Sequence, residues 1–171
     1  MKRHPSLHPL SRDHHHALVQ ARKLSLAAAT NDPGQVQPAA EGFAAFWESD
    51  LQAHFAQEER IVLPLLARAA PDSDEIRETL NQHAEIRRLV AGLNDKLARR
   101  AALEASLLAA LGESLRRHIR FEESELFPAV ESLATEEELA RMNEELETER
   151  SRAGQARCAL APKPQATEGS R

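Results

Sequence analysis

Four long segments of this sequence repeat apolar residues at intervals of three and four, the pattern of helices that bury one face. Prolines and turn-forming residues separate the segments, and the pattern predicts helices over about 11–30, 38–70, 72–99 and 102–133. A fifth helix is expected to run from about Thr135 to Arg152, because Thr135 and Glu138 have the spacing of a capping box. Short connections make neighbouring helices antiparallel. We therefore expect an all-α fold, an up-down-up-down four-helix bundle with an additional C-terminal helix.

The composition agrees with a helical fold. Ala, Leu, Glu and Arg dominate, aromatic residues are scarce and tyrosine is absent, which disfavours a β-rich structure. A chain of 171 residues is long enough for one domain with a hydrophobic core. The predicted organisation is an N-terminal extension, the bundle, the C-terminal helix and a flexible tail, at residues 1–10, 11–133, 134–152 and 153–171.

Charge and hydropathy argue against several classes of partner. The net charge of −5 does not indicate the basic surface of a nucleic-acid-binding protein. No stretch approaches the roughly 18 apolar residues of a membrane-spanning helix, and the basic start of the chain lacks the apolar run of a signal peptide. The single cysteine, Cys158, leaves no internal disulfide. We expect a cytoplasmic protein that binds neither nucleic acid nor membranes.

Each predicted helix has one or two residues on its apolar face that do not suit a hydrophobic core. The first and third helices carry a histidine there, and the second and fourth carry a histidine followed one turn later by a glutamate. Burying an unpaired carboxylate costs several kcal/mol, so four such interruptions are not expected by chance. Metal ions between the helices would balance the charge, and neutral imidazole and carboxylate are suitable ligands. The predicted metal ligands are His14, His54, Glu58, His83, His118 and Glu122.

The second and fourth helices also share a longer motif. Residues 54–64 and 118–128 both read His-x-x-x-Glu-Glu-x-x-apolar-apolar-Pro, and each follows a helix with its own inward histidine. The chain therefore consists of two similar helical hairpins, each supplying two histidines and one inward glutamate. Pairing the hairpins about a pseudo-twofold axis would give each metal two imidazoles and would let Glu58 and Glu122 bridge both metals.

These motifs resemble those of the hemerythrin family in its broad bacterial form, the HHE cation-binding domains. The similarity covers roughly Leu10 to Leu133, and its motifs occur in the family's order: Asp13-His14, His54 with Glu58-Glu59 and Leu63-Pro64, His83, and His118 with Glu122-Glu123 and Leu126-Phe127-Pro128. The resemblance implies a non-haem site of two iron ions joined by an oxo or carboxylate bridge. Zinc and manganese are less favoured, because structural zinc prefers closed sites of four ligands.

The sequence departs from the oxygen-carrying hemerythrins at two places. Arg87 stands where they have a second histidine on the third helix, and Glu122 follows His118 by four residues where they have an aspartate five residues on. The ligand set is more similar to bacterial di-iron proteins that repair nitrosatively damaged clusters, and to the iron-sensing domain of a eukaryotic ubiquitin ligase subunit. One protein ligand fewer leaves a metal position open. This favours sensing, or reaction with peroxide or nitric oxide, over simple oxygen carriage.

The expected function is therefore that of a di-iron protein that binds iron and a small ligand (dioxygen, nitric oxide or peroxide) in sensing, storage or stress response. A protein partner could bind through the C-terminal helix. The alternatives are a di-iron enzyme that acts on peroxide or nitric oxide or repairs iron–sulfur clusters, and a metal-free or zinc-stabilised structural bundle. We favour binding over catalysis. The repair proteins usually carry a further cysteine-bearing N-terminal domain, whereas only about ten residues precede the first expected helix here.

The sequence leaves the roles of several neighbouring residues open. His15 competes with His14 as the first-helix ligand. Glu59 and Glu123 could be additional ligands, hydrogen-bond acceptors behind the ligands, or exposed residues. Arg87 could face solvent or hold a carboxylate near the site.

Overall fold

The computed structural model describes residues 3–160, with side chains through Arg152, and this part of the chain is helical without strands. The all-α prediction is confirmed. A short 3₁₀ turn precedes the first long helix, two π-helical turns interrupt the second, and one interrupts the fourth. The elements are η1 (Pro5–Leu7), α1 (His8–Thr30), α2 (Pro33–Phe46), η2 (Trp47–Leu51), α3 (Gln52–Gln57), η3 (Glu58–Val62), α4 (Leu63–Ala69), α5 (Asp74–Ala98), α6 (Ala105–Phe121), η4 (Glu122–Leu126), α7 (Phe127–Leu133) and α8 (Glu136–Leu160).

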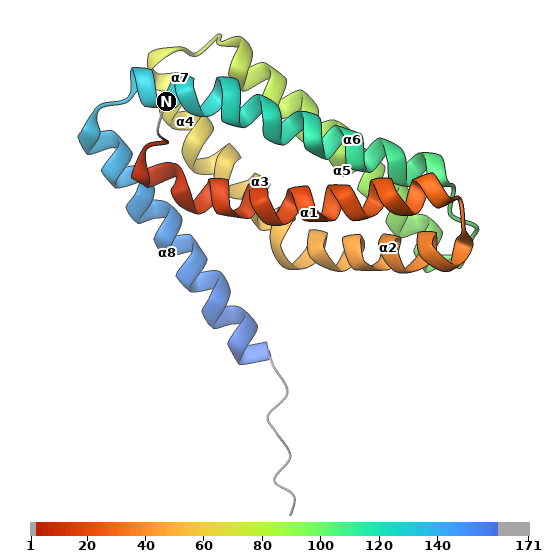
Figure 1. Ribbon diagram of the computed structural model, residues 1–171. Coiled ribbons are helices and arrows are strands. Elements are labelled where there is room, and N and C mark those ends of the chain that lie inside the picture. Colours follow the sequence, from red (N-terminus) through yellow and green to blue (C-terminus); the bar gives the residue numbers. More distant parts are fainter. Residues whose placement is uncertain (1–2, 161–171) are drawn as a thin grey trace, which may run out of the picture.

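The long helices lie side by side and form one bundle (Figure 1). Helix α1 contacts both α2 and α6, and α5 contacts the same two helices, so these four surround a common interior. Helix α8 contacts η1 and η3, then extends away from the bundle (Figure 1). No helix within residues 3–160 has the length and apolarity needed to span a membrane.

The turn between α1 and α2 begins the second helix earlier than expected. Asn31 ends α1 in the left-handed conformation, with φ of 51°. The Asp32 carboxylate then accepts a hydrogen bond from the backbone N–H of Gly34 at 3.0 Å and caps α2. Proline suits the first turn of a helix, so α2 begins at Pro33 and not near Pro38.

The predicted N-terminal extension is part of the bundle. Helix α1 begins at His8 and not at Ser11, and the 3₁₀ turn η1 leads directly into it. Leu7 and Leu10 are fully buried in the core. Pro5 and Pro9 stand in the first turns of these two helical segments, where proline is tolerated.

Helix α8 begins with the predicted capping box. The Thr135 hydroxyl accepts from the Glu138 backbone N–H at 3.3 Å, and the Glu138 carboxylate accepts from the Thr135 N–H at 3.0 Å. The helix continues to Leu160, past the Arg152 end expected from sequence. The rest of the predicted tail, residues 161–171, lies outside the described residues.

The two π-helical turns η3 and η4 occupy the same place in the repeated motif. Each begins at the inward glutamate, and the carbonyl of Glu58 or Glu122 accepts from the N–H five residues later. Pro64 and Pro128 follow, and a proline inside a helix cannot donate the usual backbone hydrogen bond. Local widening to π geometry lets the helix continue past each proline.

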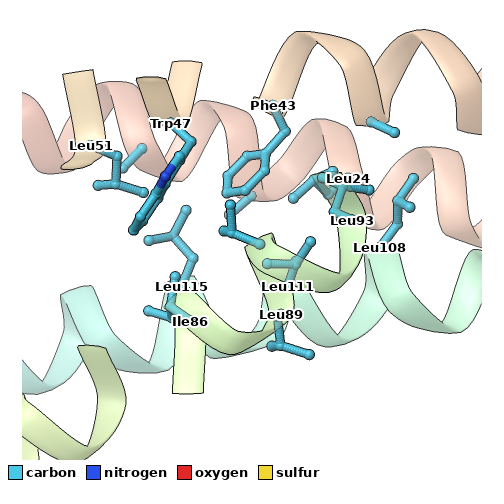
Figure 2. Packing of buried hydrophobic residues seen from close by; sticks show 14 of the residues in the cluster. Leu24, Phe43, Trp47, Leu51, Ile86, Leu89, Leu93, Leu108, Leu111 and Leu115 are labelled. Carbon is cyan, nitrogen blue, oxygen red and sulfur yellow. The ribbon is translucent and has the colours of Figure 1, made fainter. Parts of the chain in front are cut away.

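Two hydrophobic clusters fill the bundle. The first includes Phe43, Trp47 and Leu111, which lie together between the helices in Figure 2. The second, near the N-terminal end of α8, includes Phe127 and Leu146. The inward polar residues separate the two clusters: along α1, for example, Leu10 belongs to the second cluster and Ala17 to the first, with His14 between them.

Three leucines whose helical spacing matches that of the apolar faces, and which would therefore be expected in the core, are exposed. Leu18, Leu80 and Leu133 show 39%, 44% and 48% of their surface to solvent. On α1 the small residues Ala17 and Ala21 form the buried face instead, and Leu18 lies about 100° around the helix from Ala17.

Close packing of α1 against α6 requires a glycine at position 112. A Cβ added there would lie 2.9 Å from the Ala21 carbonyl oxygen and 2.7 Å from the Ser25 hydroxyl. We expect Gly112→Ala to lower the free energy of unfolding by about 1–3 kcal/mol, as overpacked core substitutions do. Gly92→Ala is the matched control, because a Cβ there meets nothing within 4 Å and alanine is the better helix former. Urea unfolding curves in which both variants lost the same stability would contradict this account.

Candidate metal centre

The six inward residues of the four long helices meet at one buried position in the bundle. None of their side chains exposes more than 4% of its surface. Their potential ligand atoms fall into two groups of four, and within each group one atom per residue lies within 4.8 Å of the others. The groups are His14, His54, Glu58 and Glu122, and Glu58, His83, His118 and Glu122. Each hairpin thus supplies the two histidines of one group, and both groups share the two glutamates.

The carboxylate of Glu58 lies between the two groups. Its Oε1 is 3.0 Å from Nε2 of His54, and its Oε2 is 3.3 Å from Nε2 of His83. One carboxylate therefore faces an imidazole from each hairpin.

Glu122 occupies the corresponding place on the other hairpin. Its Oε2 lies 3.1 Å from Nε2 of His14 and 3.3 Å from Nε2 of His118. His118 and Glu122 are four residues apart, so one helical turn presents both to the same point. All four imidazoles direct Nε2 toward the glutamates.

Nε2 of His14 and Nε2 of His54 lie 3.2 Å apart and contact each other, but most of the other atoms at this position have no hydrogen bond. Among the described residues, no hydrogen-bond partner exists for either carboxylate oxygen of Glu58 or Glu122, or for Nε2 of His83 or His118, although all are buried. Buried polar atoms without partners are costly, and buried carboxylates more so. A cation bound among them would remove the penalty, and imidazole nitrogen with carboxylate oxygen is a donor set suited to divalent transition metals. The residues therefore fit a pair of metal ions.

Each histidine is oriented by an acceptor at its other ring nitrogen. The Nδ1–H of His14 donates to Glu123, and that of His83 donates to Glu59, both at 2.7 Å. The Nδ1–H of His54 donates to Asp13 at 3.3 Å. The Nδ1–H of His118 donates to the side-chain oxygen of Gln82 at 3.2 Å. A donor role for Nδ1 leaves the lone pair of Nε2 directed at the centre, as metal-binding histidines require.

The structure answers the questions that the sequence left open about the outer residues. His14 is buried and His15 is exposed. Glu59 and Glu123 act as acceptors behind the histidines. The Arg87 guanidinium donates to Glu59 at 2.6 Å, so it holds a carboxylate near the site.

Two further arginines, which the sequence did not single out, hold the other outer carboxylates. Arg3 donates to Glu123 at 3.0 Å, and Arg150 of α8 donates to Asp13. The motif alone gave no sign of them, because both lie far along the chain from the carboxylates they contact. Gln82 was also missed, although its place directly before His83 matches that of Asp13 before His14.

Aromatic rings pack against two of the imidazoles. The ring of Phe55 stacks on His83 with centroids 3.8 Å apart, and the ring of Phe127 stacks on His14 at 5.3 Å. These contacts restrict ring rotation and keep the centre apolar on its flanks.

Ion pairing within the centre shifts the pKa values of the first hairpin's groups. Burial alone would lower the pKa of His14, but the adjacent carboxylates of Glu122 and Glu123 raise that pKa well above its usual value. Burial acts the same way on His54, and the charge of Glu58 outweighs it and raises the pKa of His54 to about 9. Burial raises the pKa of Glu58, but the neighbouring imidazoles, His54 first, bring it well below its usual value.

In the second hairpin, the pKa values of one histidine and one glutamate shift in the opposite directions. Burial and the nearby charge of His83 lower the pKa of His118 well below its usual value. Burial and the charge of Glu58 raise the pKa of Glu122. Protons and cations thus compete for the same atoms, so metal binding should release protons.

A pocket of about 250 Å³ opens beside one edge of the centre. Its polar lining residues include Asp13, His54, Gln57 and Arg150, and its apolar ones include Phe46 and Leu51. Because His54 forms part of the wall, a small molecule in this pocket would lie beside one imidazole of the centre.

The comparisons with known proteins agree with this geometry. The family model described as hemerythrin HHE cation binding domain matches residues 6–130, a stretch that contains all six inward residues. No match was found among curated proteins or among solved structures.

Proposed function

Since this chain belongs to the hemerythrin family of HHE cation-binding domains, we propose that its buried centre holds two iron ions that bind a small ligand: dioxygen, nitric oxide or peroxide. The observation that carries the proposal is the sharing of two glutamates, with unpartnered oxygens, between two pairs of imidazoles. His14 and His54 would bind one ion, His83 and His118 the other, and Glu58 and Glu122 would bridge them. When bound, the ions supply affinity for the ligand and the capacity to exchange electrons with it.

Iron is favoured over zinc by the ligand count. Each group offers two imidazole nitrogens and two carboxylate oxygens. Because the two carboxylates are shared between the ions, each carboxylate would give only one of its oxygens to each ion. Non-haem iron sites typically combine histidine and carboxylate ligands with open positions, whereas structural zinc sites are closed. Open positions are what an external ligand needs.

The chain's own residues would orient and shield the centre. The Nδ1 acceptors hold the four rings in place, and the two hydrophobic clusters on either side exclude water. The pocket beside His54 would be the entrance for the small ligand. We propose that binding of this kind serves sensing, storage or stress response.

The open positions also favour a second candidate, an enzyme that consumes peroxide or nitric oxide. Such an enzyme would convert its substrate continuously, whereas a binding protein releases its ligand unchanged.

Iron analysis with spectroscopy tests both candidates. We expect about two irons per purified chain, as in other di-iron bundles, and near-ultraviolet bands of an oxo bridge that change when the reduced protein meets dioxygen, peroxide or nitric oxide. Continuous consumption of added peroxide would identify the enzyme, and a single stoichiometric change the binding protein. Purification with bound zinc, no uptake of iron and no spectral response would contradict the proposal.

A further inference from the structure

We infer that the two metal positions bind with different affinity, and that one pair of equivalent residues, Asp13 and Gln82, sets the difference. The inference rests on the proposed function, since it requires two bound ions. The position of His14 and His54 would be the tighter one, and the position of His83 and His118 the weaker, more readily exchanged one.

The two positions are closely matched at one of their histidines. His14 donates from Nδ1 to Glu123, and His83 donates from Nδ1 to Glu59, both at 2.7 Å. Each of these carboxylates is also held by an arginine. In this half of each position the acceptor is thus a carboxylate in both cases, so the acceptors do not differ in charge.

The match ends at the other histidine. His54 donates to a carboxylate oxygen of Asp13 at 3.3 Å, whereas His118 donates to the amide oxygen of Gln82 at 3.2 Å. The distances are almost equal, so the difference is one of chemistry: an anionic acceptor in one position and a neutral acceptor in the other. Asp13 and Gln82 each directly precede the first histidine of a hairpin, so they are counterparts in the pseudo-symmetry.

The orientation of the Gln82 amide is determined by its surroundings. Its Nε2 donates to the carboxylate of Glu78 at 2.7 Å, and a carboxylate can only accept. The amide oxygen is therefore the atom that faces His118. Gln82 is 3% exposed, so water does not replace this contact.

A carboxylate acceptor strengthens an imidazole as a metal ligand more than a neutral amide does. It polarises the N–H bond, increases electron density at the opposite nitrogen and fixes the ring. Changes to such outer partners typically alter metal affinity by about 10–100-fold. Arg150 binds Asp13 from α8 and keeps its carboxylate beside His54. The first ion is thus expected at His14 and His54.

Calorimetric titration of the metal-free full chain with Zn²⁺, which is redox-inert, tests the inference. We expect two binding steps whose dissociation constants differ by about 10–100-fold. Asp13→Asn should weaken the tighter step and leave the other unchanged. The double variant Glu78→Gln with Gln82→Glu exchanges a carboxylate and an amide without changing the net charge, and it should tighten the weaker step until the two converge.

The control is Glu137→Gln, which removes a carboxylate from an exposed position of α8 and should leave both steps as in the parent. Circular dichroism checks that each variant is folded. Two steps of equal affinity in the parent, or an unchanged separation in both Asp13→Asn and the double variant, would overturn the inference while leaving the proposed function intact. Binding of fewer than two ions per chain would instead contradict the proposed function.

Discussion

The double variant Glu58→Ala with Glu122→Ala is expected to bind no metal at stoichiometric level, where the parent chain binds about two ions. Both carboxylates belong to both groups of potential ligands, so their removal takes half of the protein donors from each position at once. The remaining imidazole pairs would also lack the negative charge that balances a divalent ion. Metal content after extensive dialysis, measured by atomic emission, gives the result.

A loss of metal could also follow from a loss of fold, and the same variant separates the two. Both glutamates are completely buried, so circular dichroism of the metal-free variant first checks that it is folded, and a folded variant that binds no metal assigns the loss to the missing carboxylates. The matched control replaces Glu137 and Glu144, which are exposed on α8, with alanine and should retain full metal content. Full loading of the Glu58 and Glu122 variant would refute the bridging roles.

The second large effect is on thermal stability, which should fall when the metal is removed. A ligand present at 100 times its dissociation constant stabilises the folded state by about 2.7 kcal/mol, so two ions would contribute roughly 5 kcal/mol. For a chain of this size, 1 kcal/mol corresponds to about 2–4 °C. We therefore expect a chelator to lower the melting temperature by roughly 10–20 °C.

The cause lies in the repulsion and poor solvation of the centre once no cation is bound. Readdition of Fe²⁺ without oxygen should restore the melting temperature, whereas Mg²⁺ should not, because imidazole-containing sites favour transition metals. The Glu58→Ala with Glu122→Ala variant should melt at the same temperature with and without chelator. An equal chelator effect on that variant would show that the ions act elsewhere on the chain.

Much of the site follows from local rules of helix geometry. His54 with Glu58, and His118 with Glu122, are four residues apart, so any helix through them presents both on one face. The apolar residues at the same spacing identify that face as the buried one, as for Leu51 and Leu126. Repetition of the motif then predicts that two such hairpins meet, and the structure brings all six inward residues together.

Errors arose where contacts beyond one helix decide the outcome. Leu80 has the spacing of a core residue but is 44% exposed, because the buried face of α5 runs through Thr79 and His83. Periodicity defines a stripe about 100° wide and cannot tell which edge of that stripe a neighbouring helix covers. The early start of α2 at Pro33 is an error of a different kind, because the Asp32 cap is a local signal that was present in the sequence but was assigned to the turn between the helices.

The sequence by itself determined the helical fold, the inward histidines and glutamates and their division into two hairpins, because these depend on spacing along one helix. Only the tertiary structure decided which acceptor each imidazole has at its outer nitrogen, for example Asp13 for His54 and Gln82 for His118. It also decided that Arg150 of α8 binds Asp13. Those contacts join residues far apart in the chain, and their geometry depends on how the helices pack. The physical reason is that helix periodicity specifies the direction of a side chain, whereas its partner is specified by the packing of the whole bundle.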